Sequence, residues 1–223
     1  MNISAFNLTV TCASTVAEQL MVVLNPKLMV NHGVIYKNYY PVVWHILDFP
    51  VGSQPIQISY DSTLTAVLQE ITEDNIVNAA VYMPVTKENN KFNIVEVDNL
   101  YDLQAQGKVN PGSAASIYNN VSGEAFDVGL GDSTGRSYFT MNIQGNEDIN
   151  FTFDAEFAIV PVGETVQDQG KMVTGTVHRP WFSFKITDLT SDNIGFTFDG
   201  ENLSNVTGIA MIVHHTDDEE VFG

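Results

Sequence analysis

The fold is indicated most clearly by the stretch Asn150-Phe151-Thr152-Phe153-Asp154-Ala155-Glu156-Phe157-Ala158-Ile159. Apolar and polar residues alternate along it, and successive side chains of a β-strand point to opposite faces. The predicted inner face carries Phe151, Phe153, Ala155, Phe157 and Ile159, and the outer face carries Thr152, Asp154 and Glu156. We therefore predict one strand that packs a Phe-rich face into a core and turns the other face to water or an ion.

Similar short alternating runs, bounded by Gly, Pro, Asn or Asp, occur along the rest of the chain. Residues 16–24 fit a helix or a strand, and the pair Val22-Val23 favours a strand. Residues 99–107 favour one or two helical turns that end at Gly107. We predict an all-β fold, an antiparallel β-sandwich of roughly a dozen strands with very little helix. Residues 1–223 are expected to form a single domain, with an acidic tail from about residue 216.

Two pairs of neighbouring runs have the pattern of β-hairpins. Residues 60–63 separate the run 56–60 from the run that begins at Leu64. The polar loop 87–90 separates residues 76–85 from residues 92–97. Because turn residues between two alternating runs are the usual hairpin signal, we predict that each pair of strands is adjacent in a sheet.

The charge of the chain limits its partners. Among 223 residues, 27 are acidic and 9 are basic, and the formal net charge is −18. Such a surface repels phosphate backbones and anionic membranes, so we expect neither nucleic acid nor a membrane as a partner. Hydrophobic residues make up 44% of the chain, which is enough for a core.

The expected location is cytoplasmic. The segment 1–7 lacks the basic region and the apolar run of a signal peptide, and no stretch has the length of a membrane span. Export without a leader is the alternative. Cys12 is the single cysteine, so no disulfide can form within the chain.

Two loops offer ligands for a divalent cation as a cofactor. The candidate metal ligands are Asp98 and Asp102 in one loop, and Asp188 and Asp192 in another. Carboxylate and amide oxygens suit calcium, but neither loop has the spacing of an EF-hand. Ordinary turns capped by Asp and Asn are the competing explanation.

No motif in the sequence indicates catalysis. The chain has no nucleophile elbow, no phosphate-binding glycine loop and no zinc-type spacing of Cys and His. We therefore expect a protein that is not an enzyme.

Aromatic residues gather in two segments that do not follow a one-faced core pattern. Tyr and Trp combine a large apolar surface with one polar group, which suits planar ligands, although core packing explains each residue taken singly. The candidate ligand-binding residues are Tyr36, Tyr39, Tyr40, Trp44 and His45 in the first segment, and His178, Arg179 and Trp181 in the second. Trp44 and His45 are neighbours, so in a regular strand they point to opposite faces.

The segments 42–52, 56–60 and 65–71 carry a family resemblance. The motif Val43-Trp44-His45-Ile46-Leu47-Asp48, followed by a turn with Gly52 and a second strand, is similar to that of basidiomycete mushroom chromoproteins, the pink proteins of Pleurotus fruiting bodies. The resemblance covers about the first third of the chain. It implies a pigment carrier that colours the fruiting body and holds a planar, indolone-type organic chromophore without a covalent bond. A homodimer is also expected.

Other functions account for parts of the same pattern. Exposed Tyr and Trp side chains also stack on sugar rings, so a lectin-like or calcium-assisted carbohydrate-binding sandwich is the alternative. A pore-forming β protein is a third hypothesis, which the acidic surface disfavours.

Overall fold

The computed structural model describes residues 5–24, 39–109, 113–152, 155–162, 168–173 and 180–215. These residues form eighteen β-strands in four sheets and one short 3₁₀ turn, η2 (Ile186–Asp188). The prediction of an all-β, sandwich-like fold is confirmed. Within this part of the chain, no helix is long and apolar enough to cross a membrane.

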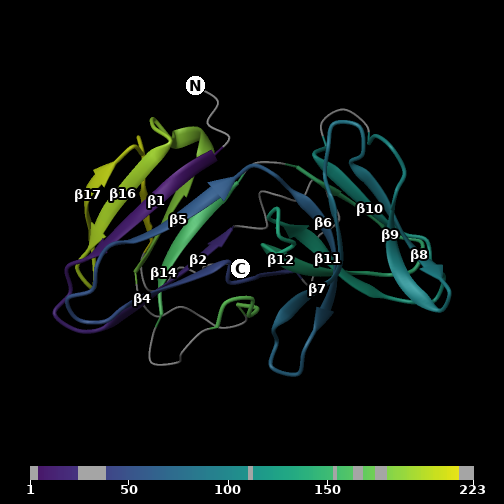
Figure 1. The fold of residues 1–223 in the computed structure, drawn as a ribbon, viewed down its shortest axis with the longest axis horizontal. Helices are drawn as coiled ribbons and strands as arrows, with labels where there is room; N and C mark the ends of the chain where they lie inside the picture. Colours follow the sequence, from purple (N-terminus) through teal and green to yellow (C-terminus); the bar gives the residue numbers. More distant parts are fainter. Residues whose placement is uncertain are drawn as a thin grey trace.

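Two of the sheets are built from the beginning and the end of the chain, and we call them the terminal half (Figure 1). The four-stranded sheet has the order β17 (Leu203–Thr207), β16 (Asn193–Phe198), β1 (Ala5–Cys12) and β5 (Ile56–Asp61). The five-stranded sheet has the order β18 (Val213–His215), β15 (Trp181–Lys185), β14 (Glu156–Pro161), β2 (Glu18–Leu24) and β4 (His45–Phe49). All neighbours are antiparallel except the pair β1 and β16.

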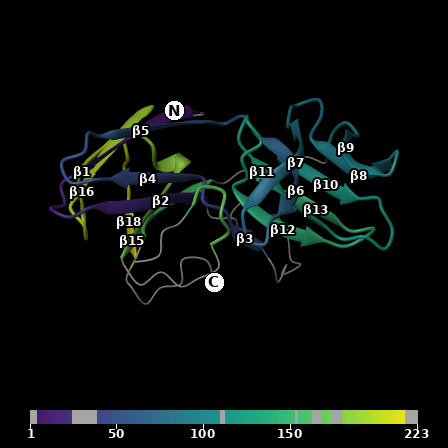
Figure 2. The same ribbon diagram turned by 60° about the horizontal axis from the view of Figure 1, so that its bottom comes forward.

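The other two sheets form the middle half, on the right of Figure 1. Their orders are β13 (Asp148–Phe151), β10 (Ala115–Asn119), β8 (Lys91–Val97), β9 (Leu100–Ala105), and β3 (Tyr39–Pro41), β12 (Phe139–Ile143), β11 (Phe126–Gly131), β6 (Thr65–Ile71), β7 (Val77–Pro84). The layout repeats that of the terminal half, with one parallel pair, β8 and β10, at the centre of the four-stranded sheet. Figure 2 shows β3 beside β12, away from β2 and β4, its neighbours in sequence.

The alternating stretch 150–159 does not form one strand, and this prediction is wrong. Phe151 ends β13, which pairs with β10 in the middle half, whereas Phe157 lies in β14, which pairs with β2 and β15 in the terminal half. The chain therefore crosses between the halves here. The predicted inner face is nevertheless buried at Phe151, Ala155, Phe157 and Ile159, and Phe153 and Asp154 lie outside the described residues.

Both predicted hairpins are wrong, because the strands on the two sides of each loop enter different sheets. β5 and β6 belong to different halves, and β7 and β8 belong to different sheets of the middle half. The predicted helical turns at 99–107 are also wrong, because β9 pairs there with β8. Asp98 and Asn99 have φ of 52° and 61° and form the two-residue hairpin turn.

The strand preferred for residues 16–24 is confirmed as β2. Its residues Leu20 to Leu24 are all buried, because this sheet is covered on both faces. A strand covered on both faces has no alternation, which is why its pattern resembled a helix.

One cluster of buried side chains runs through both halves, from Phe6 and Phe198 in the terminal half to Ile94 and Ile143 in the middle half. A smaller cluster, which includes Val23, Val160 and Trp181, lies on the opposite face of the five-stranded sheet of the terminal half. A continuous core is what a single domain requires, and the one-domain assignment stays a prediction. The acidic segment from residue 216 lies outside the described residues.

Candidate functional site

The residues that the sequence analysis named as ligand-binding lie in different environments. Tyr36, His178 and Arg179 fall outside the described residues. Tyr39 and Tyr40 form part of β3, at the edge of the middle half, and the side chain of Tyr40 is 38% exposed. Trp44, His45 and Trp181 lie within the described residues.

Trp44 lies in the core where the two halves meet. Its indole ring packs against Tyr60 of the terminal half, at 5.9 Å between ring centroids, and against Tyr138 of the middle half, at 5.7 Å. Its Nε1 donates a hydrogen bond of 3.1 Å to Asp132 Oδ2. With 2% of its surface exposed, Trp44 joins the halves and offers no open face to a ligand.

His45 is half-buried beside this junction, with its ring centroid 4.3 Å from that of Trp44. Burial and the neighbouring positive charge of Arg136 lower the pKa of His45 to about 4, although the carboxylate of Asp132 acts in the opposite direction. The imidazole is therefore neutral near pH 7 and adds no charge to its surroundings.

Trp181 belongs to a separate environment. It is 5% exposed and packs in the smaller cluster, while its ring stacks on His215 at 3.5 Å between centroids and an interplanar angle of 4°. His215 Nε2 lies 3.0 Å from the hydroxyl of Ser183. The structure thus does not bring Trp181 and Trp44 into one aromatic pocket.

The four candidate metal ligands lie in different local structures, and Asp102 is part of β9. Asp102 accepts a hydrogen bond from the backbone of Leu103, and Asp192 from the side chain of Asn193. Asp98 lies in the turn between β8 and β9, and Asp188 ends η2. The described residues place no three or more His, Cys, Asp or Glu side chains around a common metal position.

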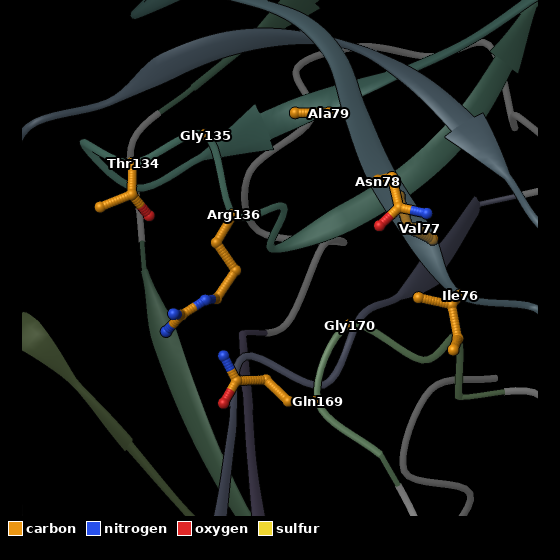
Figure 3. Close-up of a pocket in the computed structure, with 9 residues that line it drawn as sticks. All are labelled: Ile76, Val77, Asn78, Ala79, Thr134, Gly135, Arg136, Gln169 and Gly170. Carbon is orange, nitrogen blue, oxygen red and sulfur yellow. The ribbon is translucent and has the colours of Figure 1, made fainter.

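A pocket of about 320 Å³ opens at the junction of the halves (Figure 3). We call it the Arg136 pocket. Three segments line it: residues 76–79 at the start of β7, residues 134–136 between β11 and β12, and residues 169–170 after β14. Gly170 joins the third segment to the first, because its oxygen accepts from Val77 N at 2.9 Å, and its nitrogen donates to Val43 O at 2.8 Å.

Asp132 shapes the loop that carries Arg136. Its Oδ1 accepts hydrogen bonds from Thr134 N at 2.8 Å, from Thr134 Oγ1 at 2.6 Å and from Arg136 N at 3.1 Å, while Oδ2 accepts from Trp44. Burial alone would raise the pKa of Asp132, but these hydrogen bonds outweigh burial and hold the pKa below its usual value. The carboxylate stays charged and fixes both the loop and the indole.

Gly135 allows the turn that directs Arg136 toward the pocket. Its φ of +82° lies in the left-handed region, and an added Cβ would stand 2.6 Å from Cδ1 of Tyr82. The ring of Tyr82 therefore lies directly over Gly135, and it is 47% exposed. The contact with Tyr82 holds the turn in place from the side of β7.

The side chains of Arg136 and Gln169 extend toward each other (Figure 3). With its carbonyl oxygen turned to the guanidinium, Gln169 accepts from Nε at 2.8 Å, from Nη2 at 3.0 Å and from Nη1 at 3.1 Å. Among the described residues, the only ion pair within 4 Å joins Lys108 and Glu88. The described partners of the half-buried guanidinium are therefore neutral.

Sequence reasoning missed Arg136 because it treated the loop 131–135 as a turn only. One signal was available: the chain has two arginines against 27 acidic residues, and one of them directly follows a turn glycine. No protein-family model matches the chain, and neither a curated protein nor a solved structure matches it.

Proposed function

We propose that this protein binds a small organic molecule, without a covalent bond, in the Arg136 pocket. One observation carries the proposal: a half-buried guanidinium borders a pocket and pairs with a neutral amide, in a chain of net charge −18. Arginines in acidic proteins have many carboxylates available to them. Arg136, whose hydrogen-bond partner among the described residues is neutral, is suited to a polar group of a ligand.

The shape and chemistry of the pocket support a small ligand. Its volume of about 320 Å³ lies near the lower end of the range for small-molecule sites. Ile76, Val77 and Ala79 supply an apolar wall. A flat ring system with one polar end matches this combination of surfaces.

Binding is favoured over catalysis by the residues that line the pocket. Arg136 is the single ionisable side chain among the described lining residues, and a guanidinium keeps its proton at all accessible pH values. It cannot act as a general base, and none of the other lining side chains is a usual nucleophile with an adjacent base.

The resemblance to mushroom chromoproteins points to a particular ligand. An indolone-type chromophore is planar and carries a ring carbonyl, which can accept a hydrogen bond from Arg136. A donor at that carbonyl would shift the absorption of the pigment. We therefore propose the chromophore as the ligand of this pocket, in a protein that acts as a carrier.

The decisive experiment examines the protein purified from its natural source. We expect a visible absorption band that is lost on denaturation, and mass spectrometry of the released fraction should identify one organic compound. Rebinding of that compound is then measured with Arg136→Ala, which should lose it. A control, Lys87→Ala, removes the same charge from the exposed loop between β7 and β8 and should bind like wild type.

A colourless preparation that releases no small molecule would contradict the pigment proposal. Equal binding of the released compound by both variants would contradict the assignment of the site. Sedimentation of the same sample tests the proposed homodimer.

Carbohydrate binding is the second candidate, and exposed tyrosines favour it. Tyr82 is 47% exposed, and Tyr40 and Tyr101 are also exposed. Tyrosine rings beside polar groups are suited to stack on sugars. A glycan array, screened with and without calcium, tests this function, and silence in both conditions would exclude it.

A further inference from the structure

We infer that the ligand of the Arg136 pocket carries a carboxylate, and that the Gln169 amide oxygen occupies the position that a carboxylate oxygen of the ligand would take. The inference rests on the proposed function and specifies the chemical class of the ligand. It requires that the proposed chromophore carry a carboxylate in addition to its ring carbonyl, and it excludes a neutral compound of the same shape.

The acidic group in the loop of Arg136 is occupied by other donors. Asp132 lies in the same loop as Arg136, but both its oxygens are occupied by other donors: Oδ1 by Thr134 and the Arg136 backbone, Oδ2 by the indole of Trp44. The carboxylate of Asp132 is thus held by donors of its own loop and by the indole of Trp44. The positive charge of the guanidinium remains without a hydrogen-bonded carboxylate among the described residues.

The amide oxygen of Gln169 lies beside the guanidinium of Arg136. One neutral amide oxygen lies 2.8, 3.0 and 3.1 Å from the three guanidinium nitrogens, so it is the described partner of the whole group. A carboxylate presents two such oxygens with a full negative charge. Charge-assisted hydrogen bonds of this kind are about twice as strong as neutral ones, so a carboxylate should displace the amide.

Several other hydrogen-bond donors of the pocket are already bonded within the protein. The Thr134 hydroxyl and the Gly135 nitrogen donate to Asp132, and the Gly170 nitrogen donates to Val43. Arg136, Asn78 and Gln169 are the described lining residues with side-chain N–H groups, and Arg136 alone carries a positive charge. One anionic end at Arg136 and an apolar body against Ile76 and Val77 use these surfaces fully.

The net charge of the whole molecule affects the binding of an anionic ligand. A net charge of −18 repels a free anion at long range, and salt screens such repulsion more than it weakens a half-buried contact. Binding of a carboxylate should therefore tighten when salt is raised from low to moderate concentration. Binding of a neutral analogue should not change.

The experiment compares matched pairs of planar probes, beginning with indole-2-carboxylate and indole-2-carboxamide. Binding is followed by the NMR resonance of the Arg136 side-chain Nε–H group and by calorimetry at two salt concentrations. We expect the carboxylates to bind about tenfold more tightly than their amides and to shift the Arg136 resonance. Equal affinity within a pair, or preference for the amide, would overturn the inference.

Two variants test the role of Gln169. Gln169→Glu places a carboxylate beside the guanidinium, and it should raise the melting temperature while weakening carboxylate binding by about tenfold or more. Gln169→Ala removes the competing amide and should bind carboxylates at least as tightly as wild type. The control Gln104→Glu adds the same charge on the exposed part of β9 and should stay within about twofold of wild type.

The outcomes separate this inference from the function on which it rests. If amides and carboxylates bind equally well and both shift the Arg136 resonance, the pocket binds small molecules and the carboxylate assignment alone fails. If no pair binds and the natural preparation releases no ligand, the proposed function fails with it. Unchanged carboxylate binding by Gln169→Glu would also overturn the inference.

Discussion

Trp44 and Asp132 are joined by a hydrogen bond of 3.1 Å between indole Nε1 and carboxylate Oδ2, across 88 residues of sequence. The bond connects the start of β4 in the terminal half with the loop after β11 in the middle half. Because the other oxygen of Asp132 organises the loop of Arg136, this contact links the buried junction to the candidate binding pocket.

Asp132→Ala should destabilise the fold strongly. The change leaves the buried indole N–H of Trp44 without its acceptor and removes the acceptor of two backbone N–H groups, and we expect a loss of about 2–3 kcal/mol in the free energy of unfolding. Urea denaturation measures this loss. Asp192→Ala, which removes an exposed carboxylate bonded only to its neighbour, should cost less than about 0.5 kcal/mol.

The pH dependence of the same variant gives a second check. The folded-state pKa of Asp132 lies below its ordinary value of 3.8, so its contribution is complete above that pH and is lost as the pH falls through the folded pKa. The gap in stability between wild type and Asp132→Ala should therefore narrow under acidic conditions. A gap that is independent of pH would contradict this explanation.

His45 should make the protein less stable in mild acid. Its pKa falls from 6.5 to about 4 on folding, chiefly because of burial, so between these values the unfolded chain binds a proton that the folded chain does not. The free energy of unfolding therefore decreases as the pH falls through this window, by on the order of 1–2 kcal/mol after solvent screening. His45→Gln should flatten the pH profile there, while His214→Gln, at an exposed position, should leave it unchanged.

Tyr138→Phe should not destabilise the protein. The hydroxyls of Tyr138 and Tyr60 are buried and have no hydrogen-bond partner among the described residues, and burial raises the pKa of both groups. Removal of a desolvated hydroxyl that makes no hydrogen bond should leave the free energy of unfolding unchanged or raise it by up to about 1 kcal/mol. A loss of similar size on thermal or urea denaturation would reveal a partner of the hydroxyl, such as a buried water molecule.

Gly135→Ala should cost more than the same change at Gly52. Both glycines have positive φ, of +82° and +73°, but only at Gly135 would the new methyl group overlap a neighbour, the ring of Tyr82. We expect about 1 kcal/mol at Gly52 and about 2–3 kcal/mol at Gly135. The double variant Gly135→Ala/Tyr82→Ala should recover part of the difference, and strict additivity in a double-mutant cycle would argue against the overlap.

The local patterns of the sequence were read correctly where one strand and one face decide the outcome. Phe6, Leu8 and Val10 alternate in the sequence and are buried together in β1. Phe151 and Phe157 are buried, as the alternation of apolar and polar residues predicts, although they lie in different strands. Such predictions succeed because the direction of a side chain depends on neighbouring residues alone.

Strand pairing could not be predicted in this way. The turn residues after β5 and after β7 have hairpin composition, yet β5 and β6 lie in different halves, and β7 and β8 lie in different sheets. A polar loop allows the chain to reverse, but which strand lies beside which depends on the burial of all the faces together. β2 shows the same effect. Its apolar residues do not alternate because its sheet is covered on both faces, and that covering depends on the packing of the other sheets.

By itself the sequence determined the fold class, the buried faces of single strands and the acidic character of the surface, because each follows from local spacing or from composition. Tertiary structure alone decided that Trp44 would lie in the core, that Trp181 would belong to another cluster, and that Arg136 would meet Gln169. Arg136 lies between β11 and β12 of the middle half, whereas Gln169 follows β14, after the chain has returned to the terminal half. Contacts of that kind arise when sheets pack together, and no periodicity within either segment encodes them.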